Sequence, residues 1–240
     1  MQRDDILHSL FPSGFDIKTH DGLMMGQGQT NAGQRVHIAG IYDDTPLSID
    51  GALVLAEHIL NIAQSQTTDP IVLMIDSSSQ NMSRRDELLG LNEYLAHLAK
   101  SIYIAEQHGH RTLGLLYGHS AAGAFIATAL ACEMLVALPE ARPEVMDLPS
   151  IARVTKLSID TLKEKAAQTP VFAPGLSFLT KTGAIAEVWE SGADLALKLD
   201  ALLAQPRSHD VRTARGLALG GRPRADTIVH KVMVQARQCA

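Results

Sequence analysis

The 240-residue sequence has few aromatic residues, few cysteines and no long apolar run. Phe, Trp and Tyr make up 4% of the chain, with a single Trp. Its two cysteines, Cys132 and Cys239, are too few for a disulfide framework, which fits a protein of the reducing cytoplasm. The longest apolar runs are interrupted by Gly, His or Glu and are too short to span a bilayer. We therefore expect a cytoplasmic protein.

Blocks of lysine and arginine are also missing. The 21 basic and 26 acidic residues give a formal net charge of -5, which argues against nucleic acid or an anionic membrane as a partner. The first ten residues carry acidic side chains and no apolar core, so we expect no signal peptide. The length is sufficient for a sizeable core, and we expect a single domain over residues 1–240.

What the sequence does have is an alternation of strand and helix patterns. A short helix over 4–10 precedes two strands, 22–29 and 34–42, joined by a hairpin loop at 30–33. Helices over 49–66 and 83–107 then alternate with buried strands over 71–75, 112–117 and 133–138, and Leu88 is expected to face inward. This order predicts an α/β fold with largely parallel pairing.

Shorter elements follow residue 140. We expect a short strand at 144–147, a marginal strand at 184–189 and a rigid loop with two prolines at 168–175. Helices are expected over 148–156, 159–167, 176–182, 195–204, 211–219 and 226–238.

The stretch 111–131 organises the chain. Its strand leads into a turn of small residues, 118–123, and then into a helix from about 121 that is apolar on every face and therefore expected to be buried all round. The unpaired N–H groups of that first turn can receive a negative group, as an enzyme needs in order to hold a thioester oxygen that gains charge. The plainer interpretation is close packing of helix on strand. A polar loop at 76–82 follows the preceding strand, and ligands bind at this edge of such sheets.

Gly118-His119-Ser120 is similar to the nucleophile elbow of serine hydrolases. The elbow needs a glycine two residues after the serine, where this chain has Ala122. Four residues that could complete a triad follow Ser120 in the chain, but no triad signature surrounds them. They are Asp147, Asp194, His209 and His230.

Two charged clusters have simpler interpretations. His108 and His110 lack a third ligand at a recognisable spacing, so we expect a solvated loop and no metal site. Residues 84–87, Arg-Arg-Asp-Glu, are expected to form a solvated first helical turn that carries its own ion pairs.

Four blocks of the sequence resemble the γ subunit of biotin-independent malonate decarboxylase, and they occur in that family's order. They are residues 75–90 (IDSSSQNMSRRDELLG), 117–125 (YGHSAAGAF), 145–149 (VMDLP) and 169–175 (TPVFAPG). The resemblance implies a crotonase-like fold, a spiral of ββα units, with C-terminal helices from about 190 that mediate assembly. It also implies a homologous β subunit as partner, with the active site formed between the two subunits.

The substrate implied by the resemblance is a malonyl thioester on an acyl carrier protein subunit that bears a phosphoribosyl-dephospho-CoA arm. The products are the acetyl thioester and carbon dioxide, and this chain binds no cofactor of its own. Loss of carbon dioxide leaves an enolate, whose oxygen needs two fixed N–H donors. By the resemblance, one donor is Gly123, flanked by Ala122, and the other is Ser79 or Gln80. The neighbours implied to bind substrate are Ser78, Ser120 and Ala121.

The chain departs from the family at three places. Serines occupy 77–79 and Ala121 occupies a position where we expect glycine, so β-carbons narrow the pocket. His119 stands where we expect a longer cation. Two alternatives therefore stay open beside the decarboxylase: a serine hydrolase that uses Ser120, and a non-catalytic scaffolding subunit of a carboxyltransferase-like complex.

Overall fold

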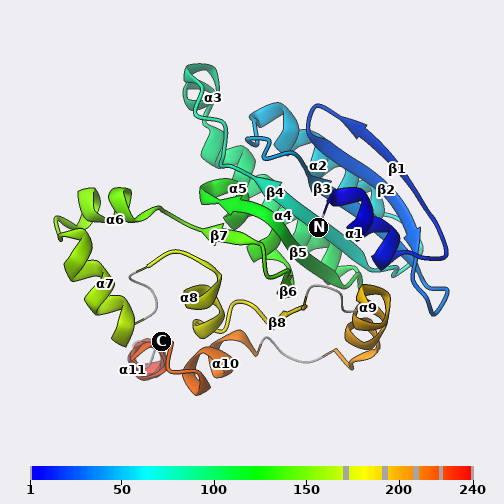
Figure 1. Cartoon of the computed structure of the whole chain (residues 1–240). Helices are drawn as coiled ribbons and strands as arrows, with labels where there is room; N and C mark the ends of the chain where they lie inside the picture. Colours follow the sequence, from blue (N-terminus) through cyan, green and yellow to red (C-terminus); the bar gives the residue numbers. More distant parts are fainter. Residues whose placement is uncertain (1, 170–172, 191–193, 208–210, 222–223, 239–240) are drawn as a thin grey trace. The chain divides into compact units, whose positions relative to one another are not determined.

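The chain is described here by a computed structural model that covers residues 2–169, 173–190, 194–207, 211–221 and 224–238 (Figure 1). It divides into two compact units: residues 1–145 with 187–207, and residues 146–186 with 208–240. The chain passes from one unit to the other at 145/146, 186/187 and 207/208, so the helix expected over 195–204 belongs to the first unit. The single domain over 1–240 stays a prediction.

The first unit is built on one mixed sheet. Its strands run in the order β1-β2-β3-β4-β5-β6-β8, and β7 pairs with β5 beyond β6. The first three strands pair antiparallel, and all later pairs are parallel. The predicted α/β fold with largely parallel pairing is confirmed. The strands are β1 (Phe15–His20), β2 (Leu23–Gln29), β3 (Arg35–Ile41), β4 (Ile71–Ser77), β5 (Thr112–Ala121), β6 (Met134–Ala137), β7 (Arg142–Glu144) and β8 (Glu187–Val188).

Strand β1 was not expected from the sequence. It forms a hairpin with β2 through Asp21 and Gly22, whose φ angles of 47° and 76° are the left-handed values of a two-residue hairpin turn. Asp-Gly between two strands is the signal that could have revealed it. The strand expected at 144–147 was placed too late, because Asp147 instead caps a helix.

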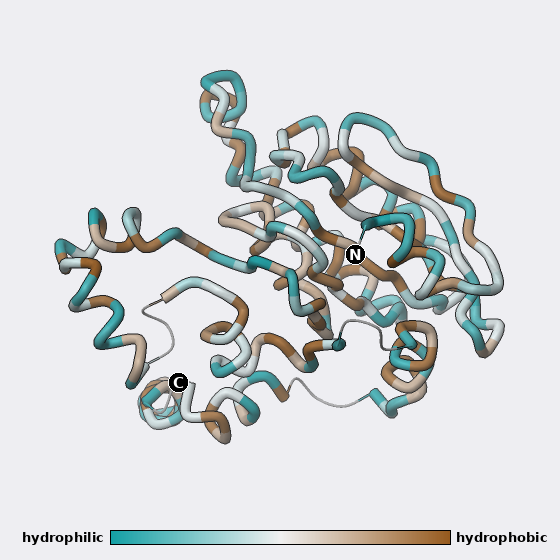
Figure 2. Tube along the Cα trace, in the orientation of Figure 1, coloured by the Kyte–Doolittle hydropathy of each residue, from teal (hydrophilic) through white to brown (hydrophobic). Residues whose placement is uncertain are grey.

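Helices cover both faces of the sheet. In β4 the side chains of Val72 and Met74 join a core cluster with α1 (Arg3–Leu10) and α9 (Leu195–Ala204). Leu73 is buried on the other face, where α2 (Ile49–Ala63) and α4 (Leu91–Gln107) pack against each other (Figure 1). Burial on both faces explains why the central strands are continuous apolar runs, which are brown in Figure 2.

Two predicted helices are shorter than expected. The helix over 83–107 is broken at Gly90, whose φ of 80° separates α3 (Arg84–Leu89) from α4. Helix α3 stands away from the sheet (Figure 1), so Leu88 is 76% exposed rather than inward. The central helix is only α5 (Ala122–Ala127), because Thr128 leaves helical geometry and a 3₁₀ turn, Ala129–Ala131, follows. Ile126 on α5 is 45% exposed, so the expectation of burial all round is wrong.

The second unit is helical. Close backbone approach explains Gly183 and Gly216, since a β-carbon at Gly183 would lie 2.4 Å from the backbone nitrogen of Gly216. The helices are α6 (Leu148–Thr155), α7 (Ile159–Gln168), α8 (Leu176–Lys181), α10 (Arg212–Ala218) and α11 (Ala225–Gln238). Part of the proline loop expected at 168–175 lies outside the described residues.

Candidate functional site

The two loops singled out in the sequence meet at the carboxyl edge of the sheet. Strands β4 and β5 pair there through Ser77 and Ser120, and α5 begins two residues later. The side-chain oxygen Oε1 of Gln80 accepts a hydrogen bond from the backbone N–H of Gly123 at 2.7 Å. The two predicted donor segments are therefore adjacent, and the Gly123 N–H already holds a carbonyl oxygen of this chain.

The start of α5 carries local strain. Ala122 has a φ of 51°, a left-handed value that costs a residue with a side chain on the order of 1 kcal/mol. A β-carbon at Gly123 would lie 2.9 Å from both Gln80 Oε1 and Leu95 Cδ1. A β-carbon at 123 would therefore require a shift of these two flexible side-chain ends, and this close approach is the plainer interpretation of the small-residue turn. Strain of this kind concentrates at functional sites.

The 76–82 loop is fixed against the segment that follows β3. Leu47 donates its N–H to the Ser79 carbonyl oxygen at 2.9 Å, and Asn81 donates to the Leu47 carbonyl oxygen at 2.7 Å. The Ser78 hydroxyl donates to the Asp44 carbonyl oxygen at 2.9 Å. Neither Ser79 nor Gln80 donates its backbone N–H to another described residue. Both predicted loop donors therefore remain available.

Ser120 does not have the geometry of a nucleophile elbow. It lies within β5 rather than on a strained turn, it is fully buried, and its hydroxyl donates to the Ile75 carbonyl oxygen at 3.4 Å. The neighbouring Ala121 is also buried. Asp147 and Asp194 cap α6 and α9, and His209 lies outside the described residues. This arrangement disfavours the serine hydrolase alternative.

A polar cluster around His119 was missed in the sequence. Its ring nitrogen Nδ1 lies 3.1 Å from Asp44 Oδ1, and Nε2 lies 3.3 Å from Glu144 Oε1. Asp76 links the surrounding loops, because Oδ1 accepts the His119 N–H at 2.8 Å and Oδ2 accepts the Asp44 N–H at 3.2 Å. Gly118 permits this contact, since a β-carbon there would lie 2.2 Å from Asp76 Oδ1. The available signal was an acidic residue at or just after the carboxyl end of each of the strands β3, β4 and β7.

The charged turn at 84–87 is not uniformly solvated. Arg85 binds the exposed Asp50 through two nitrogens, at 2.8 and 3.1 Å, but Asp86 is only 1% exposed. Burial raises the pKa of Asp86, and hydrogen bonds from the Ile49 N–H and Asn81 Nδ2 outweigh it, so the pKa lies below its usual range. The expected solvated turn is therefore wrong for Asp86, which anchors α3 to the start of α2.

The expected solvated loop at 108–110 is wrong for His110. This residue is fully buried, and its Nδ1 lies 2.8 Å from the Asp69 carbonyl oxygen. It interacts electrostatically with His37, as does His58. The Nε2 atoms of all three histidines are buried without a hydrogen-bond partner, yet no group of described His, Cys, Asp or Glu side chains has the geometry to hold a metal ion.

Two of these histidines, His37 and His58, should make the fold sensitive to acid. Burial holds the pKa of His37 and that of His58 below 6.5. The unfolded chain therefore binds protons that the folded chain does not, so the free energy of unfolding should fall as the pH decreases from about 6.5 to about 5. Burial raises the pKa of Glu106, so this carboxyl has the opposite effect as the pH falls toward 4.5.

Urea denaturation followed across this range would measure the effect. His58→Gln should make the decline shallower, whereas His20→Gln, at an exposed position, should leave it unchanged. A midpoint that is constant for the natural chain down to about pH 5 would contradict the prediction.

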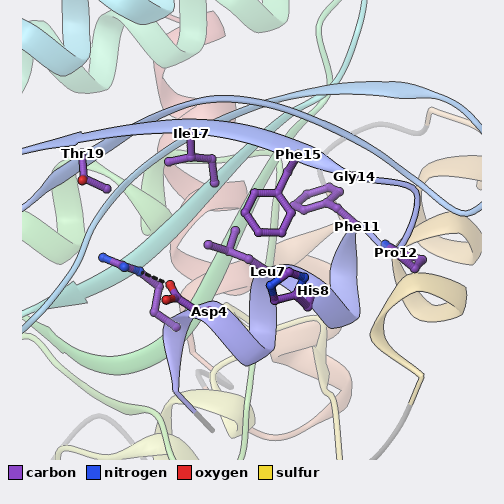
Figure 3. A pocket seen from close by; sticks show the side chains of 10 residues that line it. Asp4, Leu7, His8, Phe11, Pro12, Gly14, Phe15, Ile17 and Thr19 are labelled. Carbon is purple, nitrogen blue, oxygen red and sulfur yellow. Dashed lines mark hydrogen bonds and ion pairs between the residues drawn. The ribbon is translucent and has the colours of Figure 1, made fainter.

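An open cavity of about 710 Å³ lies elsewhere, between α1 and β1. Figure 3 shows the rings of His8, Phe11 and Phe15 along it, and the His8 and Phe15 rings meet edge to face with centroids 5.0 Å apart. None of the predicted site residues lines it. The cavity is therefore not part of the site at the carboxyl edge of the sheet.

A family model described as the malonate decarboxylase gamma subunit matches residues 43–236. The chain belongs to this family. Malonate decarboxylase gamma subunits are thus its relatives over most of its length, including both loops of the site. A curated relative, the malonyl-S-ACP:biotin-protein carboxyltransferase MADD of Malonomonas rubra, is 29% identical over 124 residues. That match covers 50% of this chain and 42% of the relative, so the chain spans less than half of it.

Solved structures share the fold. A Pseudomonas malonate decarboxylase hetero-tetramer in complex with coenzyme A matches with a TM-score of 0.78 and 21% identity, over 95% of this chain and 97% of that one. The Pseudomonas MdcD-MdcE hetero-dimer matches with a TM-score of 0.75 and 21% identity, over 98% and 100%. The transcarboxylase 12S core matches with a TM-score of 0.68 and 15% identity, over 87% of this chain and 42% of that one.

The predicted crotonase-like carboxyltransferase fold is confirmed. No described helix is long and apolar enough to cross a membrane. The cytoplasmic location stays a prediction.

Proposed function

We propose that this chain is the γ subunit of a malonate decarboxylase complex and that, with a homologous β subunit, it decarboxylates a malonyl thioester. The acyl carrier protein subunit presents that thioester on a phosphoribosyl-dephospho-CoA arm, and the chain binds no cofactor itself. The supporting observation is the family match over 43–236, which includes both loops that meet at Gln80 and Gly123. The names of the similar structures, a malonate decarboxylase hetero-tetramer and a hetero-dimer, favour a complex of the same kind.

The chemistry assigned to the site is electrostatic. When carbon dioxide leaves, the electron pair of the broken C–C bond moves onto the thioester and gives an enolate oxygen. The Gly123 N–H, with the N–H of Ser79 or Gln80, holds that oxygen, and each donor of this kind is typically worth about 3 kcal/mol of barrier. Ala122 sets the direction of the Gly123 N–H, and Ser78 and Ala121 form the wall beside it, whereas the hydroxyl of the buried Ser120 faces the Ile75 carbonyl oxygen.

The substrate has to compete with the hydrogen bond between Gln80 and Gly123. The Gln80 carboxamide oxygen is a planar carbonyl oxygen like that of a thioester, and it occupies the Gly123 N–H. Substrate must displace it, which is an ordinary exchange of one hydrogen bond for another. If the exchange does not occur, the chain is the scaffolding subunit of the second alternative.

Reconstitution tests the proposal. The chain, its β partner and the malonyl-loaded acyl carrier protein together should release carbon dioxide and form the acetyl thioester, and the chain alone should do neither. Ser120→Ala should leave the rate of the complex unchanged within about twofold, because the serine hydroxyl faces a backbone carbonyl. Hydrolysis of thioesters by the isolated chain, lost in Ser120→Ala, would instead support the serine hydrolase.

A further inference from the structure

The proposed function leaves one step without a residue, and the inference drawn here rests on that function. The enolate left by decarboxylation becomes an acetyl group only when its carbon gains a proton. The backbone amides that hold the oxygen keep their own hydrogens, so a side chain or water has to supply it. The polar cluster around His119 lies at the same edge of the sheet.

Hydrogen-bond accounting favours a proton on each ring nitrogen of His119. Nδ1 faces a carboxylate oxygen of Asp44 at 3.1 Å, and Nε2 faces one of Glu144 at 3.3 Å. An ionised carboxylate only accepts hydrogen bonds, so a ring N–H is the donor in either contact, and the imidazolium is the form that donates in both. The His119 side chain is 22% exposed, which lets water return a lost proton.

The cluster is built into the loops that carry the proposed donors. His119 precedes Ser120, the partner of Ser77 across the sheet, and its N–H binds Asp76 at the start of the 76–82 loop. Three of the five described residues other than glycine with positive φ lie beside the cluster: Asp43 and Asp44 after β3, and Ala122 at the start of α5. Strained backbone at three points around one cluster indicates a site held in place rather than an ordinary surface loop.

The other groups at this edge are poor acids for the step. Asp76 accepts two backbone N–H groups through its two carboxylate oxygens. The Tyr117 hydroxyl donates to the Ile41 carbonyl oxygen, and burial raises the pKa of Tyr117 far above neutrality. Ser120 is buried and bonded to Ile75. Among the described side chains of these strand ends, His119 is the group whose ring nitrogens face carboxylate oxygens rather than backbone carbonyls.

We propose that His119, whose ring lies between the carboxylates of Asp44 and Glu144, is the acid that protonates the enolate carbon. The C–C bond breaks, its electron pair becomes the enolate, and carbon dioxide leaves. A new C–H bond then forms with the Nε2 proton, whose N–H electron pair returns to the ring. The ring is left neutral, with Nδ1–H still donating to Asp44, and water restores the proton. Nε2 is the assigned atom because its contact, to Glu144, is the longer of the two.

The test uses the reconstituted complex with the malonyl-loaded acyl carrier protein. His119→Gln should lower the rate of acetyl thioester formation about 100-fold or more, the usual loss of a general acid. The natural complex should lose activity at alkaline pH as the imidazolium disappears, and the His119→Gln complex should lack that decline. His20→Gln, an exposed histidine on β1, is the matched control and should keep the rate and the pH profile.

Glu144→Gln separates an acid from a merely structural residue. Removing the Glu144 carboxylate makes the His119 imidazolium less stable, so the alkaline decline in rate should move to lower pH. This variant still tests the proposal if His119→Gln fails to fold. A His119→Gln complex with the natural rate and decline would overturn the proposal while decarboxylation itself stood. Rates lowered by the same factor at every pH in both variants, with the alkaline decline at its natural pH, would also overturn it. A natural complex that releases no carbon dioxide would remove the proposed function and this inference together.

Discussion

Replacing Gly123 with proline should lower decarboxylation by the reconstituted complex by a factor of about 100 to 1,000, the loss typical of one oxyanion donor. Proline has no N–H, so the enolate oxygen would lose the partner assigned at the start of α5. Position 123 is in the first turn of the helix, where the backbone N–H has no partner within the helix and proline is tolerated. The measurement is the initial rate of carbon dioxide release at saturating substrate.

Gln80→Ala is the matched variant for this prediction. It removes the carboxamide oxygen that occupies the Gly123 N–H and leaves both proposed backbone donors in the chain. Releasing one hydrogen bond of about 1 kcal/mol should lower KM about fivefold, because substrate no longer competes with the glutamine. Unchanged decarboxylation by Gly123→Pro, with an assembled complex, would favour the scaffolding subunit. Circular dichroism and complex assembly establish that both variants fold.

Trp189→Ala should destabilise the first unit by about 3–5 kcal/mol, the usual cost of truncating a buried aromatic side chain. Trp189 is fully buried in the core cluster with Val136 and with Leu195 and Leu199 of α9. Its indole nitrogen donates to Glu187 Oε2 at 3.1 Å, and its backbone N–H donates to the Ala137 carbonyl oxygen at 2.8 Å. Truncation therefore leaves a large cavity where β8 and α9 join the sheet.

The loss should lower the melting temperature by roughly 10 °C, since about 1 kcal/mol corresponds to 2–4 °C for a chain of this size. Because Trp189 is the single tryptophan, unfolding has to be followed by circular dichroism rather than tryptophan fluorescence. Trp189→Phe should recover much of the stability, and Leu197→Ala, on the exposed side of α9, should change it by less than about 0.5 kcal/mol. A melting temperature of Trp189→Ala within about 2 °C of the natural chain would contradict the core assignment.

The strand and helix order of the first unit could be predicted because its signals are local. Short aliphatic runs such as 71–75 are typical of strands buried on both faces. Ser48 caps α2, as serine favours this position. The breaks at Gly90 and Thr128 were missed, since tertiary packing decides whether a glycine or a threonine ends a helix. The same packing exposes Leu88, which the helical period placed inward.

The candidate site was likewise predicted only in part from the sequence. The sequence pointed to the 76–82 loop and to Gly123, because both follow strands whose carboxyl ends share one edge. The cluster of Asp44, His119 and Glu144 could not be found that way, since its members come from three segments of the chain. The residues in contact are up to 75 positions apart in the sequence. Their distances exist only in the folded chain.

By itself, the sequence determined the α/β class, the family to which the chain belongs and the two loops that meet at the sheet edge. The class and the loops follow from apolar periodicity and turn residues, and the family follows from the resemblance of four sequence blocks, all of which are properties of neighbouring residues. The tertiary structure alone decided that Gln80 occupies the Gly123 N–H, that Ser120 is buried and that His119 lies between two carboxylates. Each of these depends on how distant segments pack, and side-chain contacts across a sheet edge have no period that a sequence can display.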